Sequence, residues 1–454
     1  MASTEATAGD RQSDEQGAGL KRTIGTRLLF FFILGDILGG GIYALPGEVA
    51  AEVGGAIWIP FTVAFVLALL TATAYAELVT KYPVAAGAAL YVHKAFRIRF
   101  LTFMVAFLVM SSGVTSASAL AKAFAGDYFA TFFDLPIIGI SLVFIALVTL
   151  VNLRGIAESV TLNAAFTLIE VTGLLIIIVI GILSLVGGTG DPGRALEFKA
   201  GSSPLALVIA GTTLSFYALI GFEDSVNVAE ETREPSRAFP RALFGGMITA
   251  GVIYLLVTFT SSMVVETGAL SGSDAPLLEV VKAGTLSVPL TLFSVIALFA
   301  LANGALINMI MASRLVYGMA NQGIVPRLFS RVLPGRRTPW TAIIFTTALA
   351  VMLIITGDLG VLADTTVMLL LIVFTIVNVC VLVLRKDPVD HDHFHAPTIG
   401  PIIGALVSAF LITQNEAAIY LRAGIIILIG LVFYGINVAV GGRGGELDAK
   451  EMAG

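Results

Sequence analysis

Asp36, Glu170 and Glu223 are acidic residues that stand inside long apolar runs of this sequence. A charged carboxylate costs about 2.5–3.5 kcal/mol at the centre of a membrane-spanning helix, so such residues are candidates for a functional site. Burial favours the neutral, protonated form of a carboxyl group. The chemistry open to these residues is therefore the binding of a proton or another cation. For Asp36, two readings stay open: attraction of an ammonium group, and capping of the local backbone.

Glu170 is the single residue with the strongest indication of a functional role, because it interrupts the apolar run 164–185. We expect it to bind a proton or an ion. Two alternatives stay open: a structural salt bridge with a cation, and a side chain that faces a lumen without a role.

A triplet of glycines, Gly39, Gly40 and Gly41, occupies the middle of the first apolar run. Glycine costs about 1 kcal/mol relative to alanine inside a helix, so the triplet predicts a break. In a membrane, the freed backbone groups are tolerated where they line a cavity. We expect N–H groups near Gly41 and Ile42 to bind a carboxylate, and the Ile37 carbonyl to accept from an ammonium. The alternative is that the glycines serve close helix packing.

A second break is predicted at Gly221, which two adjacent carboxylates, Glu223 and Asp224, closely follow. Adjacent acids deep in a span are better accommodated where the helix opens. The carbonyls of Tyr217 and Ile220 would then add acceptors for an ammonium. The alternative for both acids is a charge that stabilises the N-terminus of the following half-helix.

Other side chains are candidates for the walls of the same site. Tyr217 could close it as an aromatic gate or could merely pack. Ser111 and Ser112 could line a side-chain pocket or could form interhelical hydrogen bonds. The tract 391–395, His-Asp-His-Phe-His, lacks the usual zinc spacings, so we expect a solvated loop and no metal site.

The composition requires a membrane domain: 57% of the residues are hydrophobic and 13% are charged, against about 25% charged in soluble domains. A span needs about 20 mostly apolar residues. Twelve candidates lie near 27–52, 56–79, 99–126, 136–153, 160–186, 204–230, 240–265, 288–319, 339–357, 361–384, 398–413 and 417–440. The single cysteine, Cys380, excludes an internal disulfide framework.

Lysine and arginine placement predicts the orientation of these spans. Cytoplasmic loops carry an excess of both residues. With the N-terminus inside, twenty of the 26 fall on the cytoplasmic side, five fall outside, and Arg314 lies within a span. Twelve spans then place both termini in the cytoplasm, with tails at 1–23, expected to be disordered, and 441–454.

The two predicted breaks fall five spans apart. Interrupted helices in corresponding positions of two halves are typical of inverted-repeat transporters. We therefore predict an all-α integral membrane protein with a five-plus-five core. The first repeat covers 24–186 and the second covers 204–386. Two extra helices follow at 397–440.

Four segments resemble, in order and spacing, the motifs of the amino acid–polyamine–organocation (APC) transporter family. They are 35–47; Tyr82-Pro83 with Gly87 and Tyr91; 216–240; and 313–320 with Gly323, Pro326, Thr338 and Pro339. The resemblance covers roughly residues 24 to 340. It implies a LeuT-like fold, with the substrate held between the broken helices 1 and 6.

The resemblance also implies roles for single residues. It assigns substrate binding to the backbone around the glycine triplet. It places Glu170 near a helix 5 lysine that replaces a coupling ion in some sodium-independent members. It makes Glu223 a pH-responsive or gating acid. The chain departs from the family at Gly40, where Ser or Ala is frequent, so one hydroxyl donor to a substrate carboxylate is absent.

We therefore expect a secondary active transporter that moves amino acids across the cell membrane by alternating access, coupled to protons. The alternative is an exchanger of amino acids or amines without net ion coupling. Sodium coupling is less favoured, because an acid already occupies the span 160–186. Asn303 and Asn308 favour a neutral substrate side chain, whereas the acids would suit a cationic one. No enzyme activity, cofactor or nucleic-acid partner is expected.

Overall fold

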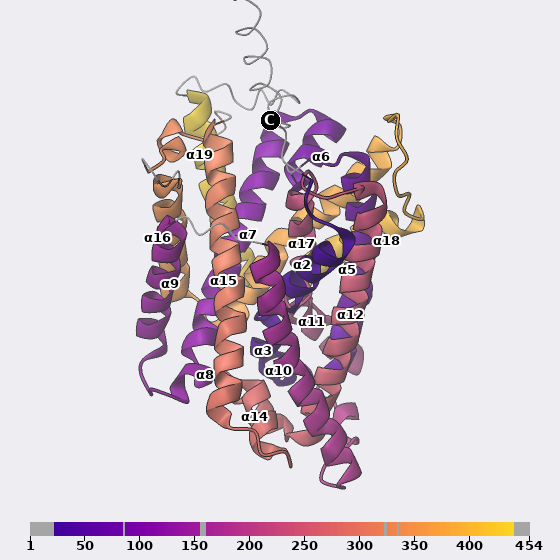
Figure 1. Ribbon diagram of the computed structural model, residues 1–454, viewed down its shortest axis with the longest axis vertical. Helices are drawn as coiled ribbons and strands as arrows, with labels where there is room; N and C mark the ends of the chain where they lie inside the picture. Colours follow the sequence, from indigo (N-terminus) through magenta and orange to yellow (C-terminus); the bar gives the residue numbers. More distant parts are fainter. Residues whose placement is uncertain are drawn as a thin grey trace, which may run out of the picture.

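The computed structural model describes residues 22–84, 87–154, 160–321, 325–333, 336 and 338–439. The predicted tails, 1–23 and 441–454, lie almost entirely outside these ranges. Long helices run roughly along the long axis of the molecule (Figure 1). Within the described ranges, β-type pairing is limited to isolated bridges, such as the one between Ile24 and Thr232. The predicted all-α class is confirmed for this part of the chain.

Every predicted span contains a helix. The longer helices are α2 (Thr26–Leu38), α5 (Trp58–Lys81), α7 (Arg99–Ala125), α9 (Ile137–Arg154), α10 (Val160–Val186), α11 (Pro204–Tyr217), α12 (Pro235–Val264), α15 (Leu290–Asn321), α16 (Trp340–Thr356), α17 (Leu359–Leu384), α18 (Ile399–Ile412) and α19 (Ala417–Ala439). The broken runs also contain α3 (Gly41–Ala44), α4 (Pro46–Val53) and the 3-10 helix η2 (Phe222–Val228). Among the described residues, ten segments are long and apolar enough to cross a membrane, whereas α16 and α18 are shorter apolar helices. Membrane crossing by these two stays a prediction.

Several short helices between the spans were not expected from the sequence. They are α6 (Gly87–Phe96), α8 (Asp127–Ala130), α13 (Thr267–Ser271), α14 (Pro276–Ala283) and the 3-10 turns η1 (Arg194–Leu196) and η3 (Arg327–Ser330). Each is far shorter than the 20 residues that a search for membrane spans detects.

The first break falls at the glycine triplet, as predicted. α2 ends before Gly39, whose φ of -43° and ψ of 167° lie outside the helical region. A Cβ atom at Gly40 would lie 2.6 Å from the Leu301 side chain. One at Gly41 would lie 2.9 Å from the Cα of Ala218. The triplet therefore interrupts the helix and also permits close packing.

The second break follows α11. Gly221 has a φ of 115°, a left-handed conformation that side chains rarely adopt. The segment that follows is the 3-10 helix η2 rather than an α-helix. A Cβ atom at Gly221 would lie 2.8 Å from the backbone oxygen of Asp36. The two breaks therefore contact each other inside the bundle.

The outer faces of several helices carry exposed aliphatic side chains. On α9, Val143, Leu147 and Leu150 follow helical spacing and are each more than half exposed. Large exposed apolar patches mark surfaces that contact a membrane or a partner. On the inside, α2 packs against α10 and α12, which encloses the first break.

Candidate functional site

A cavity of about 550 Å³ lies where the two breaks meet. The glycine triplet lines it from the first break, and Tyr217, Ala218, Ile220 and Gly221 line it from the second. Side chains of α7 and α15 form much of the remaining wall. Small-molecule sites usually have volumes of about 300–1,000 Å³, so this cavity has room for a small ligand.

Most of the site residues predicted from the sequence line this cavity. They are Asp36, Ile37, Gly39, Gly40, Gly41, Ser112, Tyr217, Ile220 and Glu223. Ile42, Ser111 and Glu170 are not among the lining residues. Ser111 is fully buried, and its hydroxyl has no hydrogen-bond partner among the described residues. Ser112 donates to the carbonyl of Val109 in its own helix, at 2.8 Å, so no interhelical bond is seen for either serine in this part of the structure.

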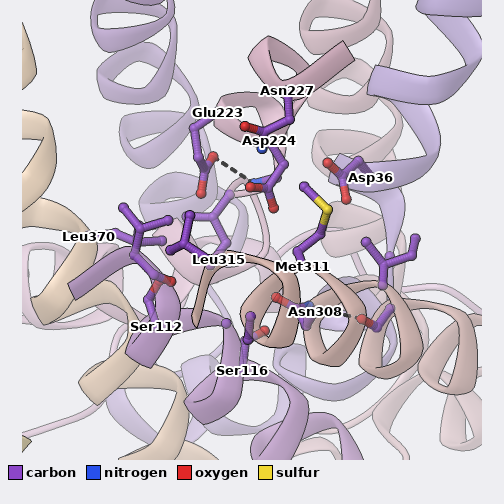
Figure 2. Close-up of a pocket in the computed structure, with 18 of the residues that line it drawn as sticks. Asp36, Ser112, Ser116, Glu223, Asp224, Asn227, Asn308, Met311, Leu315 and Leu370 are labelled. Atoms are coloured by element: carbon purple, nitrogen blue, oxygen red, sulfur yellow. Dashed lines mark hydrogen bonds between the residues drawn. The ribbon is translucent and has the colours of Figure 1, made fainter. Parts of the chain in front are cut away.

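Acidic side chains gather on one side of the cavity. Figure 2 shows Asp36, Glu223 and Asp224 close together, with Ser112 and Ser116 on the opposite side. The Oε2 atom of Glu223 accepts the backbone N–H of Gly221 at 2.8 Å. Glu223 therefore caps the backbone at the second break and also faces the cavity, which supports its helix-terminus reading. The arrangement brings three carboxyl groups together beside the broken backbone.

Tyr217 is held in place rather than free to swing in this conformation. Its hydroxyl lies 3.0 Å from the Oγ of Ser116 and donates to the backbone oxygen of Ser116 at 3.2 Å. The tyrosine is 4% exposed. This bond links α11 to α7 across the cavity, so Tyr217 forms part of the wall at the end of α11.

Glu170 lies behind the cavity wall. It is 1% exposed, and its Oε1 accepts the side-chain amide of Asn303 at 3.3 Å. The same amide nitrogen lies 3.4 Å from the Oδ1 of Asn163, which lines the cavity. The other oxygen, Oε2, is buried without a hydrogen-bond partner among the described residues. The ion pairs of the described chain do not include Glu170, so the salt-bridge reading gains no support.

The Ile37 carbonyl is already engaged by the protein. The hydroxyl of Tyr254 on α12 donates to it at 2.6 Å. This carbonyl, predicted to accept from an ammonium, would have only its second lone pair left for a ligand. On the outer half of the broken helix, the Tyr43 hydroxyl donates to the backbone oxygen of Glu170 at 2.6 Å.

Several polar residues that line the site were not predicted from the sequence. Ser116 lies four residues after Ser112, so helical spacing could have placed both on one face. Asn163 lies two helical turns before Glu170, which is the same kind of signal. Asn227 lies on η2 and joins the acidic side of the cavity (Figure 2). No local pattern marks it as a lining residue.

The histidine tract is a loop, as predicted, with His391, Asp392 and His395 exposed, but Phe394 anchors it to the neighbouring helices. The Phe394 N–H donates to the Oγ1 of Thr80 at 3.0 Å, and the ring of Phe394 packs against Phe244. His391 Nε2 lies 3.2 Å from the carbonyl of Thr80. Aromatic packing and hydrogen bonds to Thr80 hold the loop against α5 and α12. Within the described residues, no group of three or more His, Cys, Asp or Glu is arranged to hold a metal ion.

Comparison with known proteins agrees with this architecture. The family model for amino acid permeases matches residues 24–436. The chain is 28% identical over 340 residues to the chloroplastic cationic amino acid transporter 9 of Arabidopsis thaliana, covering 70% of this chain and 58% of that protein. It is 25% identical to the branched-chain amino acid permease BcaP of Bacillus subtilis (strain 168), covering 91% and 92%. It is also 25% identical to the methylthioribose transporter of the same strain, covering 93% and 94%. A family match over nearly the whole chain means that this protein belongs to the amino acid permease family.

Proposed function

We propose that this protein is a secondary active transporter that carries amino acids across the cell membrane by alternating access, coupled to proton symport. The observation that carries the proposal is the cavity between the two helix breaks, where backbone groups and carboxylates converge. The relatives' names include cationic and branched-chain amino acid transporters, which supports an amino acid as substrate.

The proposed architecture has twelve spans, both termini in the cytoplasm, and inverted repeats at 24–186 and 204–386 followed by two helices at 397–440. The cavity wall extends from the breaks to Thr102, Glu231 and Arg314. By the lysine and arginine distribution, these residues lie toward the cytoplasmic end. The structure then corresponds to a conformation whose site faces the cytoplasm.

The broken backbone suits the two charged groups of an amino acid. The first N–H groups of an α-helix lack intrahelical partners and carry the positive end of its dipole. The N-terminus of α3, continued by α4, would bind the substrate carboxylate beside Gly41. The carbonyl of Ile220 and the carboxylate of Asp36 would receive the ammonium group. Met110 and Met311 line the cavity and would contact the substrate side chain.

Glu170 is the proposed proton-coupling residue. A buried carboxyl group favours its neutral form, so protonation suits its surroundings better than ionisation. The amides of Asn303 and Asn163 connect it to the cavity. Moving one charge through 100 mV is worth about 2.3 kcal/mol, which corresponds to roughly 50-fold accumulation. One proton per zwitterion is therefore sufficient for concentrative uptake.

Uptake into liposomes tests this function. Purified protein would be reconstituted with and without an inside-alkaline pH gradient, and a mixture of radiolabelled amino acids would be supplied outside. Glu170→Gln would be compared with Glu266→Gln, which alters an exposed carboxylate in a loop. Symport predicts gradient-driven accumulation in wild type and Glu266→Gln, and its loss in Glu170→Gln. Uptake that requires preloaded amino acid and ignores the gradient would instead show an exchanger.

A further inference from the structure

A second cavity, of about 750 Å³, lies at the end of the molecule where lysine and arginine gather, which is the end proposed to be cytoplasmic. Its walls are the residues before α2, the end of α5 with Pro83 after it, the start of α12 and the loop between α17 and α18. Three arginines, Arg22, Arg237 and Arg241, and two histidines, His391 and His393, line it. Two acids, Glu234 and Asp392, also line it. The arginines alone outnumber the acids, so the cavity favours an anion.

The arginines are poorly neutralised by the protein itself. Among the described carboxylates, only that of Glu234 lies within ion-pair distance of one of them, 4.0 Å from Arg237, and both side chains are 78% exposed. Such an exposed pair holds its partners weakly. The N-terminus of α12, a helix of 30 residues, adds its positive dipole end beside Ser236.

The loop that carries the histidines is held to α5 by hydrogen bonds and forms one wall of the cavity. Arg385 donates to both carboxylate oxygens of the buried Glu77, at 2.9 and 2.7 Å. The Ala396 N–H also donates to Glu77, at 2.9 Å. In this fixed loop, the Nε2 atom of His393 is buried without a hydrogen-bond partner among the described residues. A buried polar atom of this kind normally has a partner, so a ligand or water would complete the site.

Burial lowers the pKa of His393, and the neighbouring His395 acts in the same direction. His393 is therefore neutral at neutral pH, and its Nε2 can serve as a donor to an anion when the ring carries its proton there.

The cavity adjoins an apolar surface. Arg241 is exposed on α12, and Ile248, Val252 and Leu255 follow it at spacings that place all four on one helix face. Ile248 and Val252 are 51% and 52% exposed. The cationic cavity thus sits at the end of an aliphatic stripe that faces outward from the bundle. If the phosphate of a phospholipid lay in the cavity, the acyl chains of that lipid could lie along this stripe.

We propose that this cavity binds the headgroup of an anionic phospholipid, with Arg237 and Arg241 on its phosphate and its acyl chains along the exposed face of α12. Basic pockets between helices on the cytoplasmic side suit anionic headgroups. A lipid bound in this cavity would contact α12, the residues before α2 and the α17–α18 loop at the same time. Free inorganic phosphate shares the same chemistry, but it would not use the aliphatic stripe.

Native mass spectrometry of the full-length protein tests the proposal. The protein would be titrated with phosphatidylglycerol and, separately, with phosphatidylcholine of matched chain length. The variant R237Q/R241Q would be compared with R327Q/R331Q, which removes two exposed arginines outside the cavity. Size-exclusion chromatography would check that both variants remain folded.

The expected result is preferential binding of phosphatidylglycerol that R237Q/R241Q weakens by about ten- to thirty-fold, while R327Q/R331Q stays close to wild type. Equal weakening in both variants would show a general effect of surface charge and overturn the site. Equal affinity for phosphatidylcholine would also overturn it. Displacement of the bound lipid by millimolar inorganic phosphate would show that a free anion, rather than a lipid, is the ligand.

Discussion

The side-chain amide nitrogen of Asn303 lies 3.3 Å from the Oε1 atom of Glu170, although the two residues are 133 positions apart. Asn303 belongs to α15 and Glu170 to α10. The same nitrogen lies 3.4 Å from the Oδ1 of Asn163, which faces the cavity. The proposed coupling residue is therefore buried, but two amide side chains join it to the cavity between the two helix breaks.

Asn303→Ala is expected to change the pH dependence of uptake. A donor to a carboxylate favours its ionised form, so losing the donor lets protonation persist at higher pH. The loss of this bond is therefore expected to move the pH dependence of uptake toward higher pH. Uptake measured from pH 5 to 9 in liposomes would show the shift. A uniform loss of uptake at every pH would show a structural role only.

Tyr217→Phe is expected to weaken the wall of the cavity at the end of α11. It removes the hydroxyl that pairs with Ser116 at 3.0 Å while keeping the ring. One such bond contributes about 0.5–1.5 kcal/mol to the free energy of unfolding. Tyr217→Phe, Ser116→Ala and the double variant form a thermodynamic cycle, measured by thermal unfolding in detergent. A coupling energy above about 0.5 kcal/mol is expected, and strict additivity would contradict the bond.

Gly221→Ala is expected to destabilise the protein and to abolish most uptake. Alanine at a positive φ costs about 1–3 kcal/mol, and here its Cβ would also lie 2.8 Å from the Asp36 carbonyl. The matched control is Gly435→Ala, because a Cβ atom there would meet nothing within 4 Å. Thermal unfolding and uptake would be measured for both. Wild-type behaviour of Gly221→Ala would mean that the two breaks do not need this close contact.

Arg385→Ala is expected to lower thermal stability strongly. The Glu77 side chain is 2% exposed and pairs with Arg385 at 2.7 Å, so the substitution leaves a buried carboxylate without its cation. Breaking a buried pair in this way costs about 3–5 kcal/mol. Arg237→Ala, which breaks an exposed pair with Glu234 at 4.0 Å, is the control and is expected to change stability by less than about 1 kcal/mol. A similar fall in melting temperature for both variants would contradict the importance of the Glu77 contact.

Local sequence predicted the spans and both breaks. Apolar runs of about 20 residues mark helices that a membrane can hold, because each such helix satisfies its own backbone. The glycine triplet and Gly221 mark interruptions, because glycine stabilises a helix poorly and alone adopts a φ such as 115° without strain. These signals are local, so they could be read before any tertiary contact was known. Most of the site residues that were predicted from the sequence line the cavity.

Only the tertiary structure decided which polar groups meet. The carboxyl of Glu170 points behind the cavity toward Asn303, and the Ile37 carbonyl is occupied by Tyr254. Neither contact has a sequence signal, because each depends on how helices distant in the chain rotate and pack. The histidine loop shows the same limit: its polar composition predicted an exposed loop, but not the hydrogen bonds with which Glu77 and Thr80 of α5 hold it in place. Composition determined what lies in the membrane, whereas packing determined which side chains face the cavity.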